Sequence, residues 1–326
     1  MNRPKKITIV FSVFNENESL ELLFQEILRL FKDAVVEFEV IFVDDGSSDS
    51  SAKSIKTFID NNVVNRHTLK LIRFSRNFGH EAAMIAGIDH AKGDAVICMD
   101  ADLQHPLSMI PSMIGKFREG FEIVTMARKI NYGNTNWQRF LSKNFYRLFN
   151  FLSKEKISDN SSDFFLVSGK VAEILRSNYR EKTRFLRSII QTVGFNHTSL
   201  EFDAPKRQAG KTKYSPARLL ILSSEALTSF SKAPLYLGIW FGFIFAFFSI
   251  LLGVYTLGVY FFGETPPSGY TTIVLFVTFS FSILFFIIGI IGIYVGYLFE
   301  EQKARPIYIV KEIFDSGSST ANHIAE

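Results

Sequence analysis

Acidic residues follow short apolar runs at two places in this chain. Asp100 and Asp102 stand directly after Ala95–Met99, and Asp44 and Asp45 follow a second such run. Just past the end of a strand, a turn lets two carboxylates one residue apart face the same ion. Carboxylate oxygens suit Mg²⁺ or Mn²⁺, and open α/β sheets bind ligands at the carboxyl ends of their strands. The pattern therefore predicts a nucleotide-sugar site in which a divalent ion holds the diphosphate.

The residues around Asp100 and Asp102 indicate whether this pair binds a metal ion or only forms an acidic turn. Gln104 adds a neutral oxygen, whereas the imidazole of His105 is a poorer ligand for a hard ion. The alternative is an acidic turn that caps a helix beginning at Pro106, which is the common meaning of an isolated Asp-x-Asp pair. The whole string Asp-Ala-Asp-Leu-Gln-His-Pro favours the metal site, where the ion neutralises a diphosphate leaving group.

Polar side chains at other strand ends extend the predicted site. Asp44 and Asp45 can accept hydrogen bonds from a ribose or a base, or can simply close a capped turn. Glu16 ends the first predicted strand at the same edge. Arg76 ends the third, where a structural and a phosphate-binding role are equally open. The basic loop 207–214 is expected either to close over phosphate or to be a solvated linker.

The elements that position these residues alternate between strand and helix patterns. Such alternation predicts an α/β fold with a mostly parallel sheet and helices on both of its faces. The predicted strands are Ile7–Val13, Glu39–Val43, Leu69–Phe74, Ala95–Met99 and Glu122–Ala127, and the predicted helices cover about 18–32, 49–61, 79–91 and 107–119.

Two long stretches near the C-terminal end, 235–262 and 270–299, carry no charged residue. A helix needs about 20 apolar residues to cross a bilayer, and soluble helices rarely stay apolar on all sides for so long. We therefore expect a hairpin of two transmembrane helices. Basic residues such as Lys232, Lys303 and Arg305 lie outside the pair, so the positive-inside rule places both termini in the cytoplasm. The expected location is the inner membrane, with a multi-pass topology.

Amphipathic patterns precede this hairpin. In 137–152, apolar residues share one helical face while Arg139, Lys143 and Arg147 form a stripe on another, which is typical of a helix at a membrane interface. A surface helix packed on the domain has the same pattern. These readings divide the chain into a cytoplasmic catalytic domain (1–214), an amphipathic interfacial helix (215–232), the hairpin (233–299) and a cytoplasmic tail (300–326).

Composition excludes several other classes. The net charge of +4 is too small to predict nucleic-acid binding, and the single Cys98 excludes a disulfide framework. The two long apolar stretches contain no ionisable group of the kind that an ion or proton pathway needs. Gly238-x-x-x-Gly242 and Gly292-x-x-x-Gly296 permit close helix contact, so we expect a homo-oligomer.

Four strings together resemble those of family 2 glycosyltransferases, which have the GT-A fold. They are Asp44-Asp45-Gly46-Ser47, Arg76-Asn77-Phe78-Gly79, Asp100-Ala101-Asp102-Leu103-Gln104-His105-Pro106 and Arg207-x-x-Gly210-x-Thr212-Lys213-Tyr214. The chain is most similar to the polyprenyl-phosphate branch, which contains bactoprenol glucosyltransferases and dolichyl-phosphate mannose synthases. The resemblance runs from about Ile7 to Phe299.

The resemblance implies a role for each matching residue. Donor-binding residues would be Phe14, Glu16, Phe42, Asp44, Asp100, Ala101, Arg207 and Lys213, and the Mg²⁺ or Mn²⁺ ligands would be Asp100, Asp102 and Gln104. Catalytic residues would be Asp102, Arg128 and Asp163, of which Arg128 would meet phosphate. The acceptor phosphate would lie near Arg139, Ser142 and Arg147.

The implied reaction is an inverting transfer of a sugar from a nucleotide-diphosphate sugar, UDP-glucose or a related UDP-hexose, to undecaprenyl phosphate at the bilayer. Its product would serve cell-envelope glycan modification. One alternative is a dolichyl-phosphate-mannose-synthase-type enzyme that uses GDP-mannose. Another is a non-catalytic nucleotide-sugar-binding scaffold, because Ser12 and Phe165 replace a proline and an arginine that are common in the family. A processive polysaccharide synthase is disfavoured because its Gln-x-x-Arg-Trp motif is absent.

Overall fold

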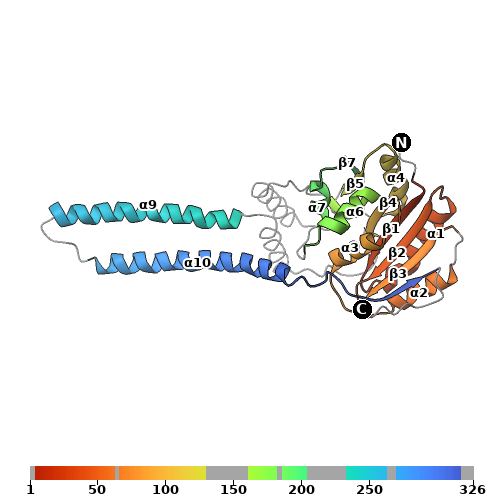
Figure 1. Cartoon of the computed structure of the whole chain (residues 1–326), viewed down its shortest axis with the longest axis horizontal. Coiled ribbons are helices and arrows are strands. Elements are labelled where there is room, and N and C mark those ends of the chain that lie inside the picture. The colour runs from red at the N-terminus through yellow and green to blue at the C-terminus, as the bar shows by residue number, and fades with distance from the viewer. Residues whose placement is uncertain are drawn as a thin grey trace. The chain divides into compact units, whose positions relative to one another are not determined.

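The central strands of the sheet are the short apolar runs of the first hundred residues. The computed structural model describes residues 4–62, 66–129, 161–181, 186–203, 233–262 and 269–316. In this part of the chain the strand order is β7-β5-β6-β4-β1-β2-β3-β8 (Figure 1). The four central strands are parallel neighbours, and they are β1 (Lys6–Val13), β2 (Glu37–Asp44), β3 (Thr68–Phe74) and β4 (Ala95–Asp100).

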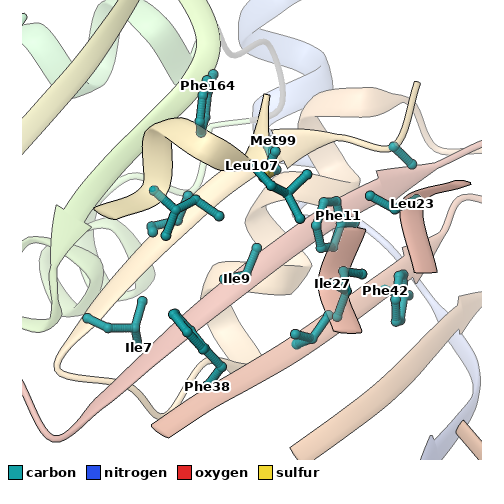
Figure 2. Packing of buried hydrophobic residues seen from close by; sticks show 14 of the residues in the cluster. Ile7, Ile9, Phe11, Leu23, Ile27, Phe38, Phe42, Met99, Leu107 and Phe164 are labelled. Carbon is teal, nitrogen blue, oxygen red and sulfur yellow. The ribbon is translucent and has the colours of Figure 1, made fainter. Parts of the chain in front are cut away.

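Helices bury both faces of these strands. Along β1, Ile9 and Phe11 join one apolar cluster and Val10 joins the other, as the alternation of side chains along a strand requires. Figure 2 shows the first cluster, in which Phe11 and Phe42 lie close to Leu23 and Ile27. That face carries α1 (Asn17–Lys32), α2 (Ser51–Asn61), η1 (Leu107–Met109) and α4 (Ile110–Arg118), while the other carries α3 (His80–His90), α6 (Gly169–Asn178) and α7 (Leu186–Thr192).

Four further strands complete a mixed sheet. They are β5 (Ile123–Arg128), β6 (Ser161–Ser168), β7 (His197–Phe202) and β8 (Val310–Asp315). β6 runs antiparallel to both β4 and β5, and β8 runs antiparallel to β3 at the edge. The predicted α/β class is confirmed, and the five strands predicted from the sequence correspond to β1 to β5. The sequence analysis did not predict β6, β7 or β8.

The chain leaves this unit and later returns to it. One compact unit contains the described residues up to 203 and again from Arg305 onward, and a second contains α9 (Ala233–Phe262) and α10 (Tyr270–Gln302). After the return, Ser75 N–H donates to the Ile309 carbonyl and the Tyr308 ring stacks on Phe74. Residues 305–315 are therefore part of the unit that contains the sheet.

The second unit holds the two helices of the predicted hairpin. By length and composition, Trp240–Val259 and Phe279–Gln302 could each cross a membrane, and their apolar side chains are not buried within the described structure. A Cβ on Gly238 would lie 3.3 Å from Ile287 Cγ2, so this glycine sits at the contact between α9 and α10. A Cβ on Gly242 or Gly292 would meet nothing within 4 Å. The homo-oligomer expected from these glycines stays a prediction.

Candidate active site

The loops that follow β1 and β2 are bound to each other at the carboxyl edge of the sheet. Asn15 has a φ of 55° and its Oδ1 accepts from Ser48 N–H at 2.8 Å. In return, Asn15 N–H donates to Ser47 Oγ at 3.0 Å, and Glu16 N–H donates to Ser51 Oγ at 3.1 Å. The Asp-Asp-Gly-Ser turn and the Asn-Glu turn therefore form one rigid wall. Phe14 and Glu16 lie on it, and the Phe14 ring is 39% exposed, enough to present a face to a ligand.

Asp45 holds the next loop in place through both of its carboxylate oxygens. Its Oδ1 accepts from Phe78 N–H at 2.6 Å and its Oδ2 from Gly79 N–H at 2.9 Å. Gly46 completes the contact, because with a φ of 68° a Cβ there would lie 2.5 Å from the Arg76 carbonyl carbon. The sequence analysis left open whether Asp45 binds a ribose or base or closes a turn, and these contacts match the structural role. The Asn-Phe-Gly string is held against the Asp-Asp-Gly-Ser turn by this carboxylate.

Asp44 is fully buried at the last position of β2. Its Oδ1 accepts from Ser47 N–H at 3.1 Å. Its Oδ2 lies 3.2 Å from Arg73 Nε, yet in the described part of the chain neither of these two atoms makes a hydrogen bond. Buried charges in native proteins are nearly always paired, and the Arg73 guanidinium supplies the opposite charge next to this buried carboxylate.

His105 serves the structure of the turn that carries Asp100 and Asp102. Its Nδ1 accepts from Asp100 N–H at 3.0 Å, and its Nε2 lies 2.8 Å from Ser162 Oγ. Since Nδ1 accepts a hydrogen bond, the ring proton is on Nε2 and is donated to the serine. Burial, reinforced by the charge of Arg128, lowers the pKa of His105 to about 3, so the ring is neutral. The motif needs this histidine to shape the turn.

Asp100 and Asp102 lie half-buried at the end of β4, where the sequence analysis expected metal ligands. Asp102 Oδ1 accepts from Gln104 N–H at 3.0 Å, which fixes the turn. Burial raises the pKa of Asp100 to about 6; the charge of His80 opposes this shift, and the charges of Asp163 and Asp102 add to it. Carboxylates that repel one another in this way are stabilised by a bound cation.

The residues present fit a divalent ion shared with a ligand. Among the described residues, no group of three His, Cys, Asp or Glu side chains is arranged to hold an ion. Mg²⁺ is commonly bound by one or two carboxylates together with the phosphate oxygens of a substrate. The pair Asp100 and Asp102, with the Gln104 amide next to it, matches that kind of donor set.

His80 joins this edge to β6, and the sequence analysis did not place it in the site. Its Nδ1 is 3.4 Å from Asp100 Oδ1 and its Nε2 is 3.5 Å from Asp163 Oδ2. Ser12 Oγ, on β1, lies 3.0 Å from the same Nδ1. Burial disfavours the charged ring, but Asp100 and Asp163 outweigh it and raise the pKa of His80 to about 9. A cationic imidazole thus bridges two carboxylates.

Asp163 is held by an arginine that the sequence analysis missed. Arg187, on α7, donates through Nε and Nη2 to the two carboxylate oxygens of Asp163. Burial would raise the pKa of Asp163, but the hydrogen bonds from Arg187 and His80 hold it well below its ordinary range. Asp163 therefore stays ionised, which suits an orienting role rather than that of a general base. No spacing in the sequence relates residue 187 to residue 163.

The remaining predicted site residues divide into three groups. Arg128 ends β5, paired in register with Phe202, and is half-buried near the turn that contains His105. Phe42 and Ala101 lie in the core beneath the edge, where Phe42 stacks on Phe11. Their roles toward a donor stay predictions. Arg139, Ser142, Arg147, Arg207 and Lys213, and the predicted interfacial helices at 137–152 and 215–232, lie outside the described residues.

The structure shows the surroundings of Ser12 and Phe165, the two residues that depart from the family pattern. Phe165 is 2% exposed and packs in the cluster that α3, α6 and α7 form on the sheet, in register with Cys98. A side chain at this position is turned into the core and away from any surface. Ser12 is the partner of His80 described above. Proline has no hydroxyl, so it could not make that contact.

The assembled edge brings together carboxylates at three strand ends, an exposed aromatic ring and a bridging imidazolium. Carboxylates placed in this way are of the kind that hold a divalent ion together with the phosphate oxygens of a ligand. This chain also matches known proteins and the model of one protein family. The model described as glycosyl transferase family 2 matches residues 8–175.

Relatives match nearly the whole chain. An uncharacterized glycosyltransferase of Synechocystis sp. is 35% identical over 315 residues, covering 95% of this chain and 96% of its own. A bactoprenol glucosyl transferase of Shigella phage SfV is 34% identical over 307 residues, covering 94% and 98%. The crystal structure of mannosyl-3-phosphoglycerate synthase from Rubrobacter xylanophilus has the same fold, with a TM-score of 0.50 at 17% identity over 68% of this chain and 71% of its own. This chain belongs to glycosyl transferase family 2.

Proposed function

We propose that this protein transfers a sugar from a nucleotide-diphosphate sugar to a polyprenyl phosphate at a membrane. The observation that carries the proposal is the half-buried pair Asp100 and Asp102 at the carboxyl edge of the sheet, in a family 2 chain. Relatives named bactoprenol glucosyl transferase match this chain over 94% of its length, including the two long apolar helices. The proposed donor is UDP-glucose or a related UDP-hexose, and the proposed acceptor is undecaprenyl phosphate.

The proposed donor site uses the strand ends described above. Phe14, Glu16 and Asp44 would face the nucleoside. Asp100, Asp102 and Gln104 would hold Mg²⁺ or Mn²⁺, which supplies charge neutralisation to the diphosphate when bound. Arg207 and Lys213 would close over the diphosphate.

The acceptor needs little activation. A phosphate monoester loses its second proton near pH 6, so at neutral pH the nucleophile is already a dianion. The protein must then align two anionic reactants and balance their charge, which is a task for fixed cations. Arg128, and the basic residues Arg139 and Arg147 with Ser142, are proposed for it. Direct attack at the anomeric carbon, with Asp163 held as an orienting carboxylate, would invert the configuration.

The proposed location follows from the two long helices. α9 and α10 would form a hairpin across the inner membrane, with the catalytic unit and both termini in the cytoplasm. An acceptor with a long hydrocarbon tail can be reached only at the bilayer surface. The product would be a lipid-linked sugar for modification of cell-envelope glycans.

Membranes that contain the protein provide the test. They are incubated with Mn²⁺, undecaprenyl phosphate and one radiolabelled donor at a time from a panel of UDP- and GDP-sugars, and lipids are then extracted. We expect label in the lipid fraction with a UDP-hexose. Transfer from GDP-mannose alone would favour the mannose-synthase alternative. Nucleotide binding without any transfer would favour the scaffold.

Asp102→Asn is the first variant to test. The amide keeps the volume of the side chain but removes the negative charge that a divalent ion needs. We expect transfer to fall by at least about a hundredfold, since metal and oxyanion stabilisation contribute several kcal/mol to such reactions. Thermal unfolding of the purified variant should be unchanged within a few degrees. Transfer at the wild-type rate would contradict the assignment of Asp102.

A further inference from the structure

The segment that follows α10 lies along the end of β3, where the loop 75–79 begins. β8 pairs with β3, and Ser75 N–H donates to the Ile309 carbonyl at 3.0 Å. The half-buried Tyr308 stacks on the ring of Phe74, the last residue of β3, with the ring centroids 5.1 Å apart and the planes 12° from parallel. The start of the loop is therefore attached to this segment.

The hydroxyl of Tyr308 reaches a second element. It donates to Asp89 Oδ2, on α3, at 2.8 Å. Arg180 Nη1 donates to both oxygens of the same carboxylate, at 2.8 and 3.0 Å. Burial and the charge of Asp89 raise the pKa of Tyr308, so the side chain stays a phenol and a donor. Tyr308 thus contacts both the strand before the loop 75–79 and the helix after it.

A series of rings continues this contact into the loop. The buried Phe74 meets the Phe78 ring edge to face, with the centroids 5.7 Å apart and the planes at 88°. The Arg76 guanidinium lies over the Phe78 ring, 4.0 Å from its centroid. Aromatic pairs in this geometry, and cations over a ring, attract each other. The positions of Phe78 and Arg76 therefore depend on the ring of Phe74, on which Tyr308 packs.

The same loop connects two parts of the proposed donor site. The N–H groups of Phe78 and Gly79 donate to the two oxygens of Asp45, in the Asp-Asp-Gly-Ser turn after β2. His80 begins α3, directly after the loop, and lies 3.4 Å from Asp100. A shift of the loop would move both of these contacts. Binding sites are sensitive to such shifts, because small errors in position weaken several interactions at once.

We propose that Tyr308 is a positioning residue for the donor nucleotide and acts through Phe74 and Phe78 on the loop between β3 and α3. This inference rests on the proposed function. The role is indirect, since Tyr308 holds the two elements on either side of the loop and so keeps the N–H groups of the loop on Asp45. The segment after α10 then contributes to donor binding as well as to the edge of the sheet.

The test is nucleotide binding to the full-length protein in detergent with Mn²⁺, measured by titration calorimetry with UDP and, separately, with GDP. Tyr308→Met keeps an apolar side chain but removes the ring and the hydroxyl. We expect the Kd of the bound nucleotide to rise about fivefold, the order of effect of one aromatic pair. Tyr308→Phe keeps the ring, and Asp89 keeps Arg180, so its Kd should stay within about twofold of the wild type.

Phe314 provides a matched control on the same segment. It lies on β8 but packs with the cluster on the other face of the sheet, with Lys56 over its ring. Phe314→Met should weaken the attachment of β8, as Tyr308→Met does, and leave the Kd unchanged. Thermal unfolding of both variants measures how far each destabilises the fold. A purely structural role of Tyr308 would lower the unfolding temperature without a change in Kd.

Phe78→Leu tests the path through the rings. It removes the ring through which Tyr308 is proposed to act, so its Kd should rise as it does for Tyr308→Met. The double variant Y308M/F78L should bind no more weakly than F78L alone. Phe78 is only half-buried, so this variant tests the inference even where Tyr308→Met does not fold.

The outcomes separate the inference from the function on which it rests. If the wild type binds neither nucleotide, the proposed function is overturned, and this inference with it. If the wild type binds but folded Tyr308→Met or Phe78→Leu binds equally well, the inference alone is overturned. Additive losses in the double variant would also overturn it. An equal loss of affinity in Phe314→Met would do the same, because the attachment of β8 as a whole would then be responsible.

Discussion

Ser12 gives the bridging imidazole of His80 its orientation. Its Oγ is 3.0 Å from His80 Nδ1, the nitrogen that also faces Asp100. For Ser12→Ala we expect kcat/KM for sugar transfer to fall about fivefold. The reason is that one hydrogen bond contributes about 1 kcal/mol, and a less well oriented His80 positions Asp100 and Asp163 less well. Steady-state kinetics with the best donor of the panel provides the measurement.

A hydroxyl elsewhere serves as the control for this prediction. The Thr57 hydroxyl donates to the Lys53 carbonyl within α2, away from the predicted site, and Thr57→Ala should leave the kinetics unchanged. If Ser12→Ala matches the wild type, Ser12 does not orient His80 for catalysis.

At the residue scale, the strand-end acids were predictable and their partners were not. Asp44, Asp100 and Asp102 follow apolar runs directly, so strand geometry alone predicts that they meet at one edge. Arg187 reaches Asp163 from a helix 24 positions further along the chain, which no local pattern encodes. Likewise, the two strings that contain Asp45 and His105 indicated chemistry, whereas the hydrogen bonds of these two residues hold the loops in place.

At the scale of elements, the side chain of the half-buried Glu81 connects the first turn of α3 to the first turn of α7. Glu81 Oε2 accepts from Leu186 N–H at 3.1 Å, with Asp163, His80 and Arg187 as its charged neighbours. Burial, and then the charge of Asp163, raise the pKa of Glu81 from 4.5 to about 7. The folded state therefore holds this proton more tightly than the unfolded chain does.

The sign of this shift predicts a stabilising variant. Above pH 7 the folded protein must ionise a half-buried carboxyl next to the negative charge of Asp163, so Glu81→Gln should raise the free energy of unfolding at pH 8 by roughly 2 kcal/mol. The gain should shrink as the pH falls through 7 and vanish near pH 4.5, where Glu81 is protonated in both states. Thermal unfolding in detergent across this pH range provides the measurement.

The exposed Glu119 is the matched control. Its side chain is 54% exposed and pairs with Lys116 on the surface of α4, so Glu119→Gln should change stability by a few tenths of a kcal/mol at every pH. A gain for Glu81→Gln that did not depend on pH would show that another effect of the amide is responsible.

Among the elements, β1 to β5 and the helices between them could be predicted because their apolar periods are clear. β6 contains the apolar run 164–167, which the sequence analysis did not read as a strand. β7 has no such run, because five of its six residues are at least partly exposed. β8 is six residues long and mostly half-buried, and it lies beyond a long apolar helix. Its place depends on an edge that β3 offers more than 230 residues earlier.

At the scale of the whole molecule, the apolar surface of α9 and α10 requires a bilayer if the proposed hairpin is right. Leu251, near the middle of α9, is 49% exposed. Leu251→Arg would place a charge near the bilayer centre, at an expected cost of about 3 kcal/mol in insertion free energy. We expect a smaller fraction of this variant to remain with membranes after alkaline extraction.

Leu22 offers a control outside the hairpin. It is 44% exposed on α1, so Leu22→Arg introduces the same charge into the catalytic unit and should leave membrane retention unchanged. Full retention of the Leu251→Arg variant would argue against α9 as a transmembrane helix.

The position of β8 in the chain has a consequence for biosynthesis. The ribosome makes β3 early and β8 only after both long helices have emerged, so the edge of β3 stays open throughout that interval. An open edge is a template for pairing with other chains. The nascent chain is thus most exposed to aggregation before β8 is translated. A product shortened after α10 would keep that vulnerability for its lifetime.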